Sequence, residues 1–287
     1  MSPILVLLRP NQWIKNLFVA APVFFTPSVL SLGSVGRVAL GMASFSALAS
    51  AMYVLNDWCD READRQHPKK RLRPLAAGTV SASTALFVAL CLAAAGFALA
   101  LFLLPPIFGQ VLAGYVVLNL AYSFWLKQIS IVDVLVIAIG FVLRVYAGGF
   151  LIGVVPTVWI VACTLLLALF LALAKRRDDV VRGIKEDHRP SLAGYDAAFL
   201  DTAVAVVLAA LLVCYLLYTT QPQNMMRMHS DKLFLTVPFV IAGVLRYLQI
   251  TMVEHRSGSP TRLAMTDRFL LLTILGWLAT FAWLIYR

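Results

Sequence analysis

The chain has 287 residues, of which 61% are hydrophobic and only 13% are charged. Because a soluble domain carries about a quarter charged residues, this composition excludes a soluble globular protein and indicates an integral membrane protein. The formal net charge of +10 would suit a nucleic-acid-binding protein, but cytoplasmic loops of membrane proteins also collect Lys and Arg, so we expect no nucleic-acid partner.

Nine apolar segments approach or exceed the roughly 20 residues that span a bilayer. In chain order they are Ile14–Leu32, Val35–Leu55, Ala82–Leu104, Ile107–Leu126, Ile131–Val154, Val158–Ala174, Ala197–Thr219, Leu233–Met252 and Phe269–Tyr286. The first contains Pro22 and Pro27 and should be kinked, which packing within a bundle tolerates. No repeat or low-complexity tract divides the chain. The sequence therefore predicts one all-α integral membrane domain, residues 1–287, with nine transmembrane helices.

Lys and Arg are distributed unequally between the two sets of connecting loops. With the N-terminus in the cytoplasm, eighteen lie on the cytoplasmic side and four on the other. The positive-inside rule therefore places the N-terminus inside and the C-terminus outside. The other two, Arg144 and Arg246, fall within apolar segments, where a charged side chain faces the bundle interior and usually serves function.

The second apolar segment ends in a row of acidic side chains. At 100° per residue, an arc of about 100° on one helix face contains Asn56, Asp57, Asp60 and Asp64. Glu62 points roughly the opposite way. Carboxylates this close repel one another unless a cation binds them, and oxygen ligands without His or Cys suit Mg²⁺. We predict that the three aspartates hold Mg²⁺, with Asn56 as an additional candidate ligand.

A structural explanation for these acids is a solvated helix end that pairs with Arg61 and Arg65, although it does not explain the alignment with Asn56. A basic loop, His67–Pro74, follows directly. A diphosphate needs metal-binding carboxylates beside Lys and Arg, because the metal bridges phosphate oxygens while the cations neutralise the remaining charge. The candidate phosphate ligands here are Arg65, Lys70, Arg71 and Arg73.

The pattern Asn56-x3-Asp60-x3-Asp64, followed by Arg73-Pro-Leu-Ala-Ala-Gly78, resembles the first aspartate motif of the UbiA prenyltransferase superfamily. The resemblance implies a nine-helix intramembrane bundle in the bacterial inner membrane, with an active-site cavity that faces the cytoplasm. Within the superfamily, the segments Arg9–Asn16, Asn56–Pro68 and Ala174–Arg177 are most similar to the decaprenyl-phosphate phosphoribosyltransferases.

The loop after the sixth segment departs from the superfamily pattern. Aromatic prenyltransferases carry a second motif there, DxxxD, which holds a second Mg²⁺, whereas Lys175–Asp187 contains no Asp followed four residues later by another. On a helix, Lys175, Asp179 and Arg182 share one face, which is more typical of phosphate binding than of metal binding. This departure favours a substrate with additional phosphates over an aromatic ring.

The resemblance thus implies a Mg²⁺-dependent enzyme that transfers the phosphoribosyl group of 5-phosphoribosyl 1-diphosphate to a polyprenyl phosphate, such as decaprenyl phosphate, towards cell-wall arabinan. The acceptor is already an anionic oxygen nucleophile, so catalysis needs positioning and leaving-group stabilisation more than a strong base. Two alternatives remain open: a UbiA-type transfer of a prenyl group from a prenyl diphosphate to an aromatic acceptor, and a non-enzymatic polyprenyl-phosphate transporter or scaffold. A homo-oligomer is compatible with the sequence.

Further substrate-binding candidates lie in other loops and inside the apolar segments. By resemblance Lys15 is a phosphate ligand, although its charge also fits the positive-inside pattern. Arg144 is expected to bind a phosphate, with a structural carbonyl or carboxylate partner as the alternative, whereas Arg246 fits substrate binding and snorkelling equally well. Tyrosines at these positions also serve as interface anchors. The remaining candidates are Tyr122, Lys127, Lys175, Arg176 and Tyr195, while His67 and His188 are expected to be loop residues without a catalytic role.

Overall fold

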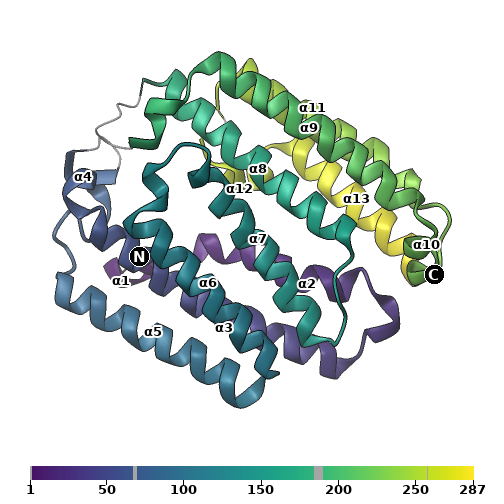
Figure 1. Cartoon of the computed structure of the whole chain (residues 1–287), viewed down its shortest axis with the longest axis horizontal. Coiled ribbons are helices and arrows are strands. Elements are labelled where there is room, and N and C mark those ends of the chain that lie inside the picture. Colours follow the sequence, from purple (N-terminus) through teal and green to yellow (C-terminus); the bar gives the residue numbers. More distant parts are fainter. Residues whose placement is uncertain (1, 67–69, 184–189, 257) are drawn as a thin grey trace.

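The computed structural model describes residues 2–66, 70–183, 190–256 and 258–287, which form an all-helical bundle (Figure 1). Within these ranges, eight helices are long and apolar enough to cross a membrane. They are α3 (Leu32–Cys59), α5 (Ala82–Leu103), α6 (Pro106–Phe124), α7 (Val132–Leu151), α8 (Val158–Val181), α9 (Ala197–Thr220), α11 (Val237–Met252), which the 3-10 helix η7 (Leu233–Thr236) extends, and α13 (Arg268–Tyr286). The predicted all-α membrane class is confirmed.

The ninth expected span, Ile14–Leu32, is not a continuous helix. The chain there forms short elements instead: α1 (Pro3–Leu8), the 3-10 helix η1 (Pro10–Asn16), α2 (Leu17–Phe24) and the 3-10 turn η2 (Pro27–Val29). Helix α2 ends at Phe24 because Pro27 lacks an amide N–H and disfavours the helical conformation at the residue before it. At about 1.5 Å per residue, α2 covers only about 12 Å. The described residues thus give eight continuous spans and one interrupted segment, rather than nine helices.

Capping side chains fix the starts of five of the eight long helices. Each of these residues precedes its helix and accepts a hydrogen bond from the amide three residues later: Ser31, Ser81, Thr157, Asp196 and Asp267. Such a cap satisfies one of the amides that a helix N-terminus leaves without an intrahelical partner. These residues explain why most boundaries agree with the apolar segments within a few residues.

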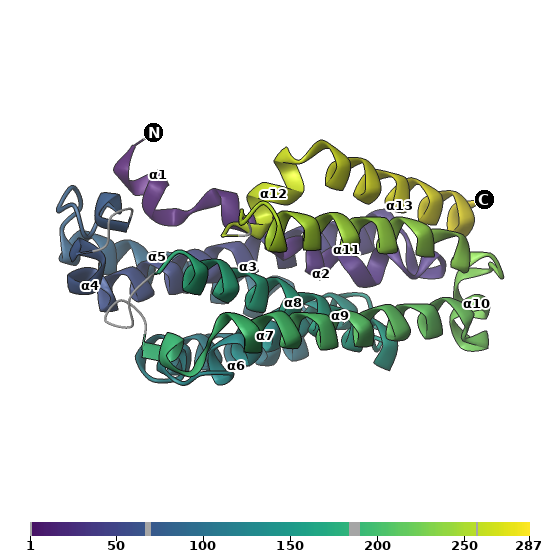
Figure 2. The ribbon, with the colours of Figure 1, turned by 90° about the horizontal axis from the view of Figure 1, so that it is seen from above.

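Consecutive long helices alternate in direction, so the bundle has two ends (Figures 1 and 2). The N-terminus and α4 (Arg61–Gln66) lie near one end, and α10 (Pro222–Met228) and the C-terminus lie near the other. Shorter elements connect the helices: η3 (Lys70–Leu72), η4 (Leu126–Gln128), η6 (Pro190–Gly194) and α12 (Pro260–Thr266).

Two of the four hydrophobic clusters found among the described residues connect most of the long helices. One joins α2, α3, α6 and α7 and includes Val19, Phe45 and Phe108. The other joins α8, α9 and α11 and includes Phe170 and Leu200. Helix α7 contacts α2, α6 and α8, and so connects the two clusters. The polar side chains of α7 therefore lie where both halves of the bundle meet.

Candidate active site

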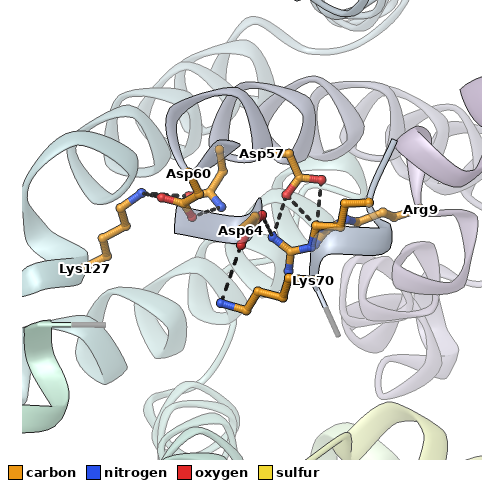
Figure 3. Close-up of polar contacts among 8 residues, drawn as sticks. Arg9, Asp57, Asp60, Asp64, Lys70 and Lys127 are labelled. Atoms are coloured by element: carbon orange, nitrogen blue, oxygen red, sulfur yellow. Dashed lines mark hydrogen bonds and ion pairs between the residues drawn. The ribbon is translucent and has the colours of Figure 1, made fainter. Parts of the chain in front are cut away.

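The acidic motif does not occupy one uninterrupted helix face. Helix α3 ends at Cys59, Asp60 has φ −89° and ψ 2°, and α4 begins at Arg61. Figure 3 shows the consequence: Asp60 turns toward Lys127, whereas Asp57 and Asp64 point toward a different group of cations. The expected single face is corrected to two adjoining ion-pair groups, because the helix breaks within the motif.

Asp57 and Asp64 form the first group around one guanidinium. Each is 2% exposed, and both bind Nη1 of Arg73, with distances of 3.0 Å to Asp57 Oδ1 and 2.6 Å to Asp64 Oδ2. Nη2 of Arg9 donates to both oxygens of Asp57, at 2.6 and 2.8 Å. Lys70 Nζ lies 3.8 Å from Asp64 Oδ1. Two buried carboxylates thus share cations supplied by two separate segments of the chain.

Asp60 forms the second group with Lys127 of η4. The ammonium of Lys127 contacts Asp60 Oδ1 and lies 3.4 Å from Asn56 Oδ1. The amide of Asn56 donates to Asp60 Oδ2 at 3.0 Å. A pocket of about 470 Å³ opens beside this group, lined by Trp58, Cys59, Asp60, Arg61, Glu62, Ser123, Phe124, Lys127 and Gln128. The sequence placed Lys127 and the acidic motif in different loops, and the structure brings them together.

A third polar group centres on Asp133, in the first turn of α7. Its carboxylate is 0% exposed and accepts hydrogen bonds from Arg176 Nε at 2.7 Å, Ser191 Oγ at 3.0 Å and the Tyr195 hydroxyl at 2.7 Å. Burial, and then the hydrogen bond to Asp133, raise the pKa of Tyr195, so its phenol remains protonated and donates. Arg176 is 1% exposed and pairs with Asp133, and substrate binding by Arg176 stays a prediction.

The interior cation Arg144 is held by neutral groups. It is 4% exposed, and its nitrogens donate to Asn16 Oδ1 at 2.8 Å, the Gly140 carbonyl at 2.7 Å and the Tyr115 hydroxyl at 3.0 Å. No carboxylate pairs with it among the described residues. Lys15, in η1, lies within electrostatic range of Arg144. Phosphate binding by Lys15 and Arg144 therefore stays a prediction, now with a structural partner for Arg144 identified.

Other predicted ligands lie apart from the two aspartate groups or contribute less directly. Arg65 binds the exposed Glu62 at 2.9 Å, Arg71 is exposed, and Arg246 binds Asp267 at 2.7 Å and Glu254 at 2.8 Å. Arg246, within α11, is thus held by two carboxylates, and a role in substrate binding stays a prediction. Tyr122 is half-buried in α6.

The expected phosphate face of α8 is changed by the same kind of pairing. Lys175 is exposed, but Arg182 binds Asp178 at 2.9 Å. Asp179 in turn lies 3.3 Å from Arg176. The remainder of the predicted basic loops, His67–Lys69 and residues 184–189 with His188, lies outside the described residues.

The carboxylates of the aspartate groups are candidate ligands for Mg²⁺. No three His, Cys, Asp or Glu side chains within the described ranges are grouped closely enough to hold a metal by themselves. Asp57 and Asp64 nevertheless converge on one nitrogen of Arg73, and the ligand atoms that they offer are carboxylate oxygens, which Mg²⁺ prefers. Because Mg²⁺ is typically held by one or two carboxylates and completed by substrate phosphates, these residues fit the ion. The joint role of all three aspartates stays a prediction.

Two residues of these groups were not selected from the sequence. Arg9 stands in a left-handed conformation, φ 53°, between α1 and η1, and its contact with Asp57 joins residues 48 positions apart. Asp133 is 43 positions from Arg176. The only local signals were the Arg9-Pro10 step, which marks a turn, and an acidic residue at a helix start.

Sequence and fold comparisons identify proteins that are similar to this chain. Residues 14–272 match the UbiA prenyltransferase family. The decaprenyl-phosphate phosphoribosyltransferase of Mycolicibacterium smegmatis is 31% identical, over 99% of this chain and 93% of the relative, and that of Mycobacterium tuberculosis is 32% identical, over 95% and 91%. The structure of a UbiA homolog from Archaeoglobus fulgidus bound to DMAPP and Mg²⁺ superposes with a TM-score of 0.74 at 20% identity, covering 99% of each chain. This multi-pass membrane protein belongs to the UbiA prenyltransferase family.

Proposed function

We propose that this protein transfers the phosphoribosyl group of 5-phosphoribosyl 1-diphosphate to a polyprenyl phosphate, such as decaprenyl phosphate, and releases diphosphate. The observation that carries the proposal is the Asp57–Asp64 pair with Arg9, Arg73 and Lys70 around it. These groups supply ligands for a metal and cations for several phosphates in one place. Similarity along nearly the whole chain to relatives named for this reaction supports the choice of substrates.

The residues divide the work by charge. Mg²⁺, held by Asp57 and Asp64 with Asp60 as a further ligand, would neutralise charge that develops on the diphosphate leaving group. Arg73 and Arg9 hold these carboxylates in the resting protein and are close enough to bind phosphate oxygens once the donor enters. Substitution at the anomeric carbon passes through an oxocarbenium-like transition state. These groups would favour it by positioning the donor and by stabilising the negative charge of the departing diphosphate.

The acceptor determines where the reaction takes place. Its prenyl chain remains in the bilayer, while the aspartate groups lie near the ends of α3 and α6, where long apolar helices meet polar loops. By the positive-inside count, this end faces the cytoplasm. We therefore propose a single domain in the bacterial inner membrane, with the N-terminus and the site on the cytoplasmic side.

A substrate comparison tests the proposal. Detergent-purified protein is incubated with Mg²⁺, decaprenyl phosphate and labelled 5-phosphoribosyl 1-diphosphate, and in parallel with a prenyl diphosphate and an aromatic acceptor. We expect a labelled phosphoribosyl lipid and equimolar diphosphate only in the first reaction. Prenylated aromatic product without a ribosylated lipid would contradict the substrate assignment. Lipid binding without diphosphate release from either pair would instead support a transporter or scaffold.

A further inference from the structure

The turn between α6 and α7 contains a backbone conformation that its own sequence disfavours. Ile131, directly before α7, has φ 69° and ψ −48°. A β-branched residue at positive φ is a steric outlier and persists only where surrounding groups impose it. The group that holds it is Tyr195, whose hydroxyl accepts a hydrogen bond from the Ile131 amide at 2.5 Å.

Tyr195 is itself fixed by the carboxylate of Asp133, both of whose oxygens accept hydrogen bonds. Its hydroxyl donates to Asp133 Oδ1 at 2.7 Å, while Asp133 Oδ2 accepts from Arg176 at 2.7 Å and from Ser191 at 3.0 Å. Because both the carboxylate and Arg176 are fully buried, each member restricts the others. The phenol proton points to Asp133, which leaves the phenol oxygen to accept from Ile131. We call Asp133, Arg176, Ser191 and Tyr195 the Asp133 clamp.

A second contact presses the same turn against η6. Ser130 Oγ donates to the Ser191 carbonyl at 2.7 Å. A methyl group at Gly194 would lie 2.3 Å from Ser130 Oγ, so the close approach depends on the missing side chain at that position. The clamp and this contact together secure both Ser130 and Ile131 to the segment that precedes α9.

The secured turn carries Lys127, four residues before Ile131. Backbone hydrogen bonds from Gln128 to Trp125 and from Ile129 to Leu126, at 3.1 and 3.2 Å, make the intervening chain compact. A shift of Ile131 is therefore transmitted to η4 and to its lysine. The ammonium of Lys127 contacts Asp60 and lies within reach of Asn56. The location of the clamp thus sets the position of a cation at the candidate active site.

We propose that Tyr195 is a positioning residue that, through Asp133 and Ile131, holds Lys127 opposite Asp60. The sequence had suggested direct substrate binding by Tyr195, but its hydroxyl is occupied on both sides. The alternative is that the clamp only stabilises the fold. The proposal rests on the proposed function where it assigns Lys127 a part in turnover, so its test needs one measurement that requires no substrate.

The first measurement is amide hydrogen exchange of residues 126–131 in detergent. Tyr195→Phe removes the acceptor for the Ile131 amide, so these residues should exchange at least about tenfold faster, the equivalent of losing one hydrogen bond. The matched control is Tyr215→Phe. Tyr215 lies near the C-terminal end of α9, far from Ile131, and its buried hydroxyl also has two partners, Thr236 and Trp277, both at 2.6 Å. It should leave exchange of 126–131 unchanged. Unchanged exchange in Tyr195→Phe would overturn the proposal.

The second measurement is a double-mutant cycle on kcat/KM with Lys127→Met. Tyr195→Phe should lower kcat/KM about tenfold in the native chain but less than about twofold when Lys127 is already absent, because interacting residues are not additive. A purely structural clamp predicts the same factor in both backgrounds, and that outcome would overturn the positioning role. If the native protein shows no phosphoribosyl transfer, the proposed function fails, while the exchange result still decides whether Tyr195 holds the turn.

Discussion

At the scale of single residues, the site is built from carboxylates that the protein neutralises with its own cations. Arg73 is only 25% exposed and binds two carboxylates that are almost fully buried. Buried charges without partners are costly, so Arg73 and Arg9 stabilise the resting protein by pairing with these carboxylates, and they also supply positive charge for anions. We therefore expect replacement of the aspartates to affect mainly turnover and replacement of Arg73 to affect mainly stability.

Replacement of the aspartates should reduce turnover by a much larger factor than the modest loss of stability from the weakened ion pairs explains. Asp57→Asn, Asp60→Asn and Asp64→Asn should each reduce turnover at least about a hundredfold, the scale of losing a major electrostatic stabiliser. They should also raise the Mg²⁺ concentration that gives half-maximal activity, measured by titration after chelation. Glu62→Gln is the control, since Glu62 is 66% exposed and its ion pairs among the described residues are with Arg61 and Arg65. Near-normal turnover of Asp64→Asn would exclude the assigned metal role.

Loss of Arg73 should be visible as loss of stability. Arg73→Met removes the 2.6 Å contact of Asp64 and leaves, among the described residues, the longer one to Lys70, so the free energy of unfolding should fall by about 1–3 kcal/mol, as for a buried acceptor that loses its donor. The control, Arg65→Met, removes an exposed pair and should change it by less than about 1 kcal/mol. Thermal unfolding in one detergent compares the two variants, and equal losses would refute the bridging role.

At the scale of helices, the length of the apolar segments predicted most spans well. The features that it did not predict, such as the end of α8, involve ion pairs between residues far apart in the sequence. Helix α8 ends at Val181 instead of Ala174, because the buried side chains of Arg176 and Arg177 pair with Asp133 and Asp201 and the helix continues beyond its apolar part. No local pattern links such residues. The Asn56–Asp64 spacing singled out the acidic motif as a candidate site, which stays a prediction, but it did not reveal the break at Asp60 or the contact of Asp60 with Lys127 of η4.

Helix packing offers a test that is independent of the chemistry. A methyl group at Gly148 of α7 would lie 1.9 Å from the Val19 carbonyl of α2, and backbone cannot move aside as a flexible side chain does. Gly148→Ala should therefore destabilise the protein by about 1–3 kcal/mol, the usual cost of overpacking.

Gly114 provides the matched control for this substitution. It lies inside α6 with no atom within 4 Å of the added methyl group. Gly114→Ala should be neutral or stabilise by up to about 1 kcal/mol through helix propensity. Thermal unfolding measures both variants, and a harmless Gly148→Ala would show that α2 does not pack this closely against α7.

At the scale of the whole molecule, the sequence predicted an all-helical membrane bundle because burial in lipid requires long apolar helices with internally satisfied backbones. It overestimated the number of continuous helices because composition alone does not reveal how prolines divide a segment. The interrupted α1–α2 region has a structural consequence, since its left-handed Arg9 reaches Asp57. The expected helix over residues 14–32 gave no indication of that contact.

The orientation of the bundle can be tested with two engineered cysteines in a cysteine-free background. Gln66 and Gln223 are both exposed, and five continuous spans, α5 to α9, separate them, so they must lie on opposite sides of the membrane. The positive-inside distribution places Gln66, beside the aspartate groups, in the cytoplasm. A membrane-impermeant thiol reagent should therefore label Gln223→Cys in intact cells, and Gln66→Cys only in inside-out vesicles. Labelling of both from one side would contradict an odd number of spans between them, whereas the reverse pattern would place the site outside, away from a cytoplasmic donor.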